Sequence, residues 1–83
     1  MIFYVYMLKG VNSKITKTYV GYTNNLKLRL KKHNSGIGAK STRGYKWKII
    51  YKKRFYDKRL AMSFEYKLKK DRALRKKILE NKY

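Results

Sequence analysis

The sequence predicts an α+β fold in which a small three-stranded antiparallel sheet is flanked by helices, in the order β-β-α-β-α-α. Three observations lead to this prediction. The 83 residues suffice for one small domain, spanning residues 1–83, with a modest core. Aromatic and β-branched runs occur three times, and helical spacing of apolar residues follows the second and the third. An apolar fraction of 43% is enough to pack a core despite the charge.

The first two apolar runs predict a β-hairpin. Residues 2–8 (IFYVYML) and 17–23 (KTYVGYT) are rich in aromatic and β-branched side chains, and the Gly, Asn and Ser between them favour a turn. Gly21 interrupts the second strand. A glycine inside a strand indicates that backbone or ligand comes close to it.

The segment after the hairpin predicts a helix with two basic residues on its apolar face. Residues 23–25 (TNN) offer caps, and the Asn-Ser-Gly of residues 34–36 ends the helix near His33. The spacing i, i+3, i+4 and i+7 places on one face Leu26, Arg29, Leu30 and His33. Arg29 and His33 therefore share the leucine stripe, where their presence calls for a partner or a function.

A loop and a third strand come next. Residues 35–46 contain three glycines, small polar residues and three basic residues, so their backbone can approach a phosphate chain closely. Residues 47–55 (WKIIYKKRF) predict the strand. We expect it to have one buried face, formed by Trp47, Ile49, Tyr51 and Phe55.

Two aspartates predict the starts of the last two helices. Asp57 can cap a helix over residues 58–70, and Asp71 can cap a shorter one. Glu65 lies at the edge of the first apolar stripe, and Asn81 lies one turn beyond the second. The residues expected to point inward are Leu60, Phe64, Leu68, Leu74 and Ile78.

The charge of the chain indicates a polyanionic partner. Lys and Arg number 24 against 4 Asp and Glu, a formal net charge of +20, for which phosphate is the obvious counterpart. The absence of cysteine excludes disulfides, zinc fingers and thiol nucleophiles. Because no signal peptide or membrane-length apolar run is apparent, we expect a soluble intracellular protein, in the cytoplasm and nucleoid or in the nucleus, without membrane contact.

Carboxylates are too few for a two-metal nuclease site, which needs several of them together. Two of the four, Asp57 and Asp71, are expected to be caps. One Mg²⁺ on a single carboxylate such as Glu65, completed by water and substrate phosphate, remains open. Arg29 can then stabilise charge on a phosphoryl group, and His33 or a tyrosinate can take a proton from water.

Each of these residues also has a structural reading that the sequence leaves open. Tyr6 and Tyr19 can be packing residues of half-buried strands, and His33 can interact with the helix dipole or its cap. Arg29 and Glu65 can form a plain ion pair.

Four short motifs nevertheless occur together in one order. They are YVY at residues 4–6, YVG at 19–21 with Arg29 and His33 after it, GAKSTR at 38–43, and LAMSFE at 60–65. In this combination the chain resembles the GIY-YIG nucleases. It is most similar to the small stand-alone domains and to the nuclease domain of the subunit that cuts branched DNA, without that subunit's RING-type zinc module.

The resemblance implies a one-metal phosphodiesterase. Glu65 would bind Mg²⁺ or Mn²⁺, and Arg29 would steady the scissile phosphate. Tyr6 and Tyr19 would line the site, one of them acting as general base with His33 accepting a tyrosine proton. We favour Tyr6 as the base, provided that the metal, Arg29 and the positive field lower its pKa from the usual ~10 of a phenol.

The expected substrate is DNA, branched or single-stranded, recognised by structure rather than by sequence, as in repair or recombination. Lys40 and Arg43 would hold the DNA backbone, Gly21 would let it approach, and Asn81 matches a late asparagine of the family. A separate protein subunit can supply targeting. The main alternative is a non-catalytic basic DNA- or RNA-binding protein, and a structural ribosome-associated protein ranks third.

Overall fold

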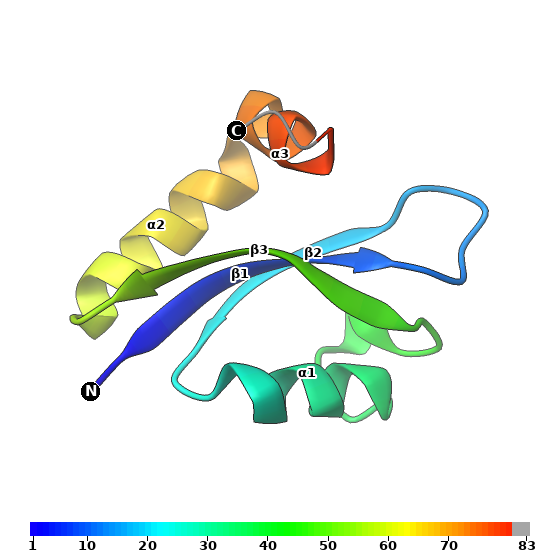
Figure 1. Cartoon of the computed structure of the whole chain (residues 1–83), viewed down its shortest axis with the longest axis horizontal. Coiled ribbons are helices and arrows are strands. Elements are labelled where there is room, and N and C mark those ends of the chain that lie inside the picture. The colour runs from blue at the N-terminus through cyan, green and yellow to red at the C-terminus, as the bar shows by residue number, and fades with distance from the viewer. Residues whose placement is uncertain (81–83) are drawn as a thin grey trace.

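The computed structural model describes residues 1–80, and its sheet and element order confirm the predicted α+β fold (Figure 1). The antiparallel strands, in the spatial order β2-β1-β3, are β1 (Phe3–Gly10), β2 (Thr18–Thr23) and β3 (Trp47–Phe55). The helices are α1 (Leu26–Asn34), the 3₁₀ helix η1 (Lys40–Thr42), α2 (Lys58–Lys70) and α3 (Arg72–Leu79). Helix α1 covers one face of the sheet, and α2 and α3 cover the other. The 3₁₀ helix lies in what the sequence predicted as plain loop.

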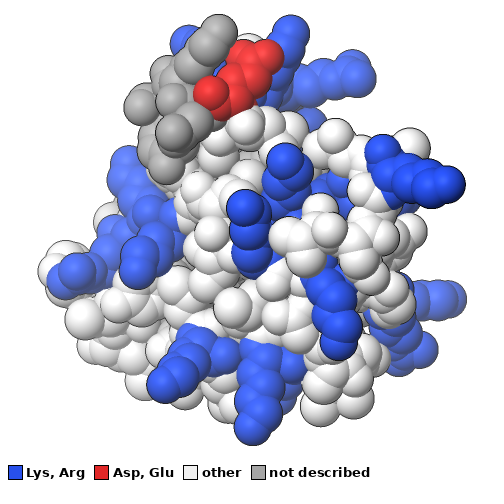
Figure 2. Space-filling view, turned by 45° about the vertical axis from the view of Figure 1, so that its right-hand side comes forward, with Lys and Arg blue, Asp and Glu red and all other residues white. Residues whose placement is uncertain are grey.

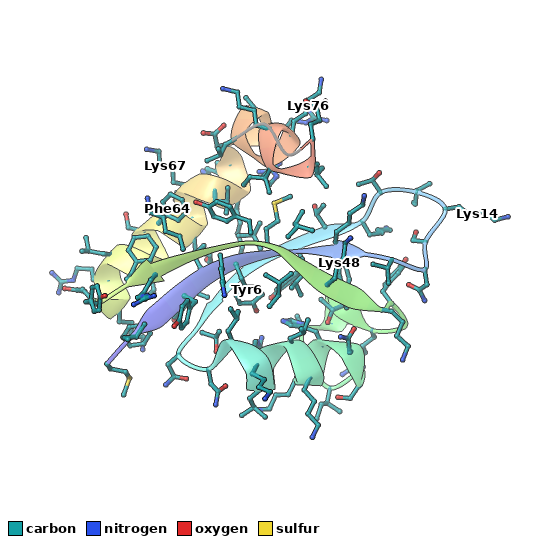
Figure 3. The ribbon with its side chains drawn as sticks, viewed as in Figure 1. Tyr6, Lys14, Lys48, Phe64, Lys67 and Lys76 are labelled. Carbon is teal, nitrogen blue, oxygen red and sulfur yellow. The ribbon has the colours of Figure 1, made fainter. Side chains whose placement is uncertain are left out.

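The central strand β1 is buried on both of its faces. Its residues Val5, Tyr6, Met7 and Leu8 are each at most 1% exposed. Successive side chains of a strand point to opposite faces. Val5 and Met7 consequently join the core under α2, whereas Tyr6 and Leu8 join the core under α1. Figure 3 shows Tyr6 on the α1 side and Phe64 on the α2 side of the sheet.

A β-bulge overturns the prediction that β3 has a single buried face. Met7 pairs with Tyr51 but Leu8 pairs with Ile49, so Ile50 is inserted between two paired positions. The extra residue reverses the alternation of the strand. Trp47 and Ile49 therefore pack on the α1 side, and the α2 side receives Ile50, Tyr51 and Phe55.

The predicted helix caps are confirmed. Asn25 Oδ1 accepts the backbone N–H of Leu28 at 3.1 Å and begins α1. Asp57 and Asp71 do the same for α2 and α3. Two carboxylates are thus committed to backbone N–H groups and are poor candidates for chemistry.

One inward residue of α2 was predicted wrongly. Leu60 is 59% exposed, and the buried face of the helix carries Ala61, Phe64 and Leu68 instead. These three fall at i, i+3 and i+7, which turns Leu60 about 100° away from Ala61. Ala61 is fully buried in this face. Leu74 and Ile78 of α3 point inward as predicted. None of the helices within residues 1–80 combines the length and the apolarity needed to cross a bilayer.

Candidate active site

The site is built around Tyr6, whose phenol lies over the neighbouring strand at Gly21. Tyr6 and Gly21 are cross-strand partners, and a Cβ added to Gly21 would lie 2.5 Å from the Tyr6 hydroxyl oxygen and 2.8 Å from its Cζ. Only glycine leaves room for the ring at this position. The close approach predicted at Gly21 is therefore made by Tyr6, and a contact of the buried Gly21 with DNA stays a prediction without structural support.

Helix α1 supplies two hydrogen-bond partners to the Tyr6 hydroxyl. His33 Nε2 lies 2.9 Å from it, and the Arg29 Nε–H donates to it over 3.4 Å. The Tyr19 ring lies beside His33, with centroids 4.9 Å apart, and 6.4 Å from the Tyr6 ring. The two basic residues of the leucine stripe thus meet the two motif tyrosines. His33 is fully buried in this contact, so a simple helix-capping role does not account for it.

A fifth polar residue, Thr42, completes this cluster and was missed by the sequence reasoning. Its hydroxyl lies 3.0 Å from His33 Nδ1, and the residue is fully buried in η1. The signal was present in the GAKSTR motif, where a threonine stands between two basic residues. Lys40 and Arg43, the predicted DNA-backbone ligands, are both exposed beside Thr42.

The loop that carries Thr42 is closed by one side chain of α1. Asn34 donates its Nδ2–H to the Trp47 carbonyl at 3.1 Å, and its Oδ1 accepts the Trp47 N–H at 2.5 Å. The Trp47 indole N–H then donates to the Thr42 carbonyl at 2.9 Å. These bonds hold the loop against the end of α1 that presents His33.

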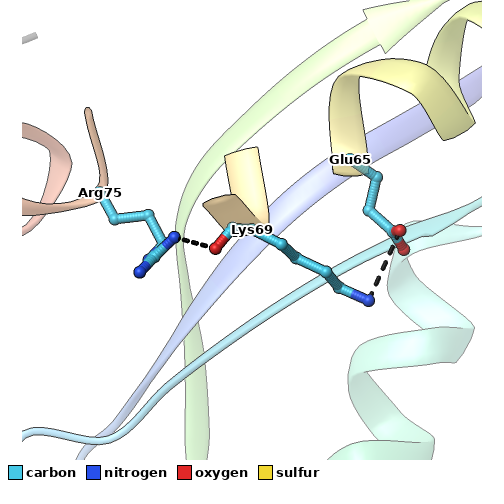
Figure 4. A network of polar contacts seen from close by, with 3 residues as sticks. All are labelled: Glu65, Lys69 and Arg75. Carbon is cyan, nitrogen blue, oxygen red and sulfur yellow. Dashed lines mark hydrogen bonds and ion pairs between the residues drawn. The ribbon is translucent and has the colours of Figure 1, made fainter. Parts of the chain in front are cut away.

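Glu65 approaches from α2, on the other face of the sheet. Its side chain extends from α2 toward β2, with α1 beyond it (Figure 4). The side chain is 18% exposed and pairs with Lys69 Nζ at 3.5 Å. Within residues 1–80, Glu65 therefore has Lys69 as its ion-pair partner, while Arg29 bonds Tyr6, and the plain Arg29–Glu65 ion pair is excluded.

Burial sets the direction of the pKa shift at Tyr6 and at His33. It raises the pKa of Tyr6; Arg29 opposes this, while Tyr19 and the negative charge of Glu65 add to it. Arg29 thus acts on the Tyr6 pKa in the predicted direction but burial outweighs it, and the lowering expected from a bound metal stays a prediction. Burial, reinforced by Arg29, lowers the pKa of His33, so its imidazole is neutral at neutral pH. The hydrogen bond to Tyr6 raises the pKa of Arg29, which stays charged.

Glu65 is the carboxylate that fits a divalent cation. No group of three His, Asp or Glu side chains within residues 1–80 could hold a metal together. A hard, partly exposed carboxylate suits Mg²⁺ or Mn²⁺, because Mg²⁺ in particular keeps several waters and takes substrate phosphate as a ligand. Asn81, the other suggested participant, lies outside the described residues.

Basic side chains are spread over the face of the molecule that Figure 2 shows. On the face shown in Figure 2, Lys and Arg project from every region, whereas acidic side chains gather at one corner. Lys14, Lys67 and Lys76 point away from the fold in Figure 3. Such a surface attracts a polyanion in many orientations. The distribution of charge therefore does not locate the functional site, which has to be identified from the side chains clustered around Tyr6.

Comparison with known proteins finds a matching family model and similar relatives. A family model described as the GIY-YIG catalytic domain matches residues 2–78. A UPF0213 protein of Clostridium perfringens is 50% identical over 68 residues, which cover 81% of this chain and 70% of the relative. A UPF0213 protein of Pediococcus acidilactici is 42% identical over 83 residues, covering 95% and 82% of the two chains.

A solved structure is similar as well. The solution NMR structure of a UPF0213 protein from Bacillus halodurans matches with a TM-score of 0.55 and 37% sequence identity, covering 99% of this chain and 86% of that one. The names of these relatives state neither a substrate nor a reaction. They support the fold and the relationship, and leave the activity to be argued from the site.

Proposed function

The chain belongs to the GIY-YIG family, and from that premise we propose that it is a metal-dependent DNA endonuclease that hydrolyses phosphodiester bonds. The observation that carries this proposal is the cluster at the β2 edge. There a charged guanidinium and two phenols meet, and the partly exposed carboxylate of Glu65, on the opposite helix layer, is near enough for its charge to act on Tyr6. A net charge of +20 supplies the attraction for a nucleic acid.

Arg29 is assigned to the scissile phosphate. Its Nε–H is anchored on the Tyr6 hydroxyl, which fixes the plane of the guanidinium. The remaining N–H groups can then bind phosphate oxygens in the forked geometry that only arginine offers. Charge that develops on the phosphoryl oxygens is stabilised by a group already in place, which is the most effective form of such stabilisation.

We assign the general base to Tyr19 in place of Tyr6. Tyr6 is 1% exposed, its hydroxyl contacts both His33 and Arg29, and burial raises its pKa. Tyr19 is half-buried, and water can reach it. In this role Tyr19 would take the proton of the attacking water.

Glu65 would hold Mg²⁺ or Mn²⁺, with water and phosphate oxygens as further ligands. When bound, the cation supplies Lewis-acid polarisation of the phosphate and charge neutralisation. Lys69 must release the carboxylate for this to happen, and at 51% exposure its side chain has solvent into which it can swing.

The proposed substrate is DNA recognised by its structure, branched or single-stranded, in repair or recombination. Lys40 and Arg43 are exposed on the loop next to the site and would grip the backbone on that side. Backbone contacts of this kind position a duplex without reading its bases. Selection of the target then depends on DNA shape or on a separate targeting subunit.

The test is incubation with labelled single-stranded, duplex, flapped and four-way-junction DNA in Mg²⁺ or Mn²⁺. We expect cleavage of at least one substrate, loss of cleavage with chelator, and loss of cleavage in Glu65→Gln with DNA binding retained. Glu80→Gln, which removes the same charge from the end of α3, is the matched control and should cleave normally. Tight binding of every substrate without cleavage would instead support the non-catalytic nucleic-acid-binding function that the charge also favours.

A further inference from the structure

Thr42 makes two hydrogen bonds that can be satisfied in one way only. Its Oγ1 lies 2.7 Å from the Ala39 carbonyl oxygen and 3.0 Å from His33 Nδ1. A threonine hydroxyl has a single proton, and a carbonyl oxygen can only accept. The Thr42 proton therefore goes to Ala39, and the Thr42 oxygen must accept a proton from His33. This requires His33 to carry hydrogen on Nδ1.

The direction of the next bond follows from that proton. The buried His33 is neutral and holds one ring proton, so with Nδ1 protonated its Nε2 is an acceptor. The Tyr6 hydroxyl, 2.9 Å away, consequently donates to Nε2. The lone pairs of the Tyr6 oxygen remain free to accept the Arg29 Nε–H.

We propose that Thr42 is a positioning residue that fixes the tautomer of His33, and through it directs the Tyr6 hydroxyl so that this oxygen holds Arg29. The proposal rests on the proposed function, because Arg29 is the residue assigned to the phosphate. In the opposite tautomer Nε2–H would donate to Tyr6, and the Tyr6 proton would need a new acceptor. Arg29, which has donors only, cannot provide one.

Hydrogen bonds and close packing hold the backbone around Thr42 in place. The Thr42 backbone N–H donates to the Ala39 carbonyl at 3.0 Å, and the Thr42 carbonyl accepts the Trp47 indole N–H. Gly38 lies directly against the imidazole, since a Cβ there would be 2.6 Å from His33 Nδ1. The backbone of the loop therefore packs against the ring, and the Thr42 hydroxyl lies at Nδ1.

The chain offers a clean readout, because His33 is its one histidine. Nitrogen-15 NMR of the labelled protein distinguishes a protonated ring nitrogen from an unprotonated one, and the two imidazole signals need no assignment against other histidines. Above pH 7, without DNA or metal, we expect Nδ1 to be protonated and Nε2 unprotonated in the wild type. Thr42→Ser keeps the hydroxyl and should keep this pattern.

Thr42→Val keeps the shape of the side chain but removes the acceptor, and should shift the tautomer toward Nε2–H. Single-turnover DNA cleavage should then fall by about 10- to 100-fold, a range typical of lost orienting partners, and Thr42→Ser should restore it. Protonated Nε2 in the wild type, or an unchanged tautomer in folded Thr42→Val, would overturn the proposal. If Thr42→Val does not fold, the wild-type and Thr42→Ser tautomers decide it alone. If the tautomers are as predicted but the protein cleaves no DNA, the hydrogen-bond directions from Thr42 through His33 to Tyr6 are supported and the nuclease assignment is refuted.

Discussion

Replacing Gly21 by alanine tests the packing on which the site depends. The new Cβ would lie 2.5 Å from the Tyr6 hydroxyl oxygen and 3.1 Å from Tyr19 Cε2. Ordinary contact begins at 3.4 Å, so the Tyr6 phenol must move by about 1 Å. Tyr6 is 1% exposed and bonded to His33 at 2.9 Å, which leaves no free direction. Overpacking of this kind costs typically about 1–3 kcal/mol, and we expect Gly21→Ala to destabilise the protein by roughly 2 kcal/mol.

Denaturant unfolding measures the loss of stability in Gly21→Ala, and Gly10→Ala serves as the control. A Cβ on Gly10 meets the Lys17 side chain at 3.4 Å and other atoms at 3.8 Å, so the change in the free energy of unfolding should stay below about 1 kcal/mol. Displacing the Tyr6 hydroxyl also disturbs Arg29, and Gly21→Ala should therefore cleave DNA more slowly even under conditions where it is fully folded. If Gly21→Ala is as stable as Gly10→Ala and cleaves at the wild-type rate, the placement of Tyr6 over Gly21 is wrong.

Three further predictions concern the charges of the site. Arg29→Ala should lower the single-turnover cleavage rate by about 10²- to 10³-fold. Arg29→Lys should not restore the rate, because an ammonium cannot bind two phosphate oxygens in the forked geometry of a guanidinium. A loss of under tenfold would reduce Arg29 to a binding residue. Lys69→Met should tighten Mn²⁺ binding measured by calorimetry, but only a few-fold, since exposed pairs contribute about 0.2–1 kcal/mol; weaker binding would contradict competition for Glu65. Folding lowers the pKa of His33 from its unfolded value of 6.5. The neutral His33 side chain therefore contributes fully to the free energy of unfolding above pH 6.5, and this contribution is lost as the pH falls from 6.5 toward the folded pKa. Thermal unfolding between about pH 7.5 and about pH 5.5 should show a steeper loss in the wild type than in His33→Gln, and equal slopes would refute this.

Features set by neighbouring residues could be predicted from the sequence. A carboxylate or amide side chain that caps a helix acts on N–H groups two or three residues away, so Asn25, Asp57 and Asp71 could be recognised locally. Helical spacing likewise placed Arg29 and His33 on one face, and the structure gives that face the tyrosines as neighbours.

Features set by long-range packing could not be predicted from the sequence. The bulge at Ile50 depends on the register of β3 against β1, which no local pattern specifies, and it exchanged the faces of the strand. The raised pKa of Tyr6 comes from burial under α1, an effect that sequence spacing does not measure. Thr42 was missed because a buried threonine in a glycine-rich loop looks like any other turn residue until its contact with His33 is seen.

The central claim is that Glu65 binds one cation beside Tyr19 and Arg29, and paramagnetic broadening by Mn²⁺ tests it most directly. Substoichiometric Mn²⁺ added to nitrogen-15-labelled protein should broaden first the amide signals around Glu65 and Tyr19 and the Arg29 Nε–H. The same addition to Glu65→Gln should leave those signals sharp. Broadening centred on the capping residues Asp57 or Asp71, or unchanged in Glu65→Gln, would contradict the account.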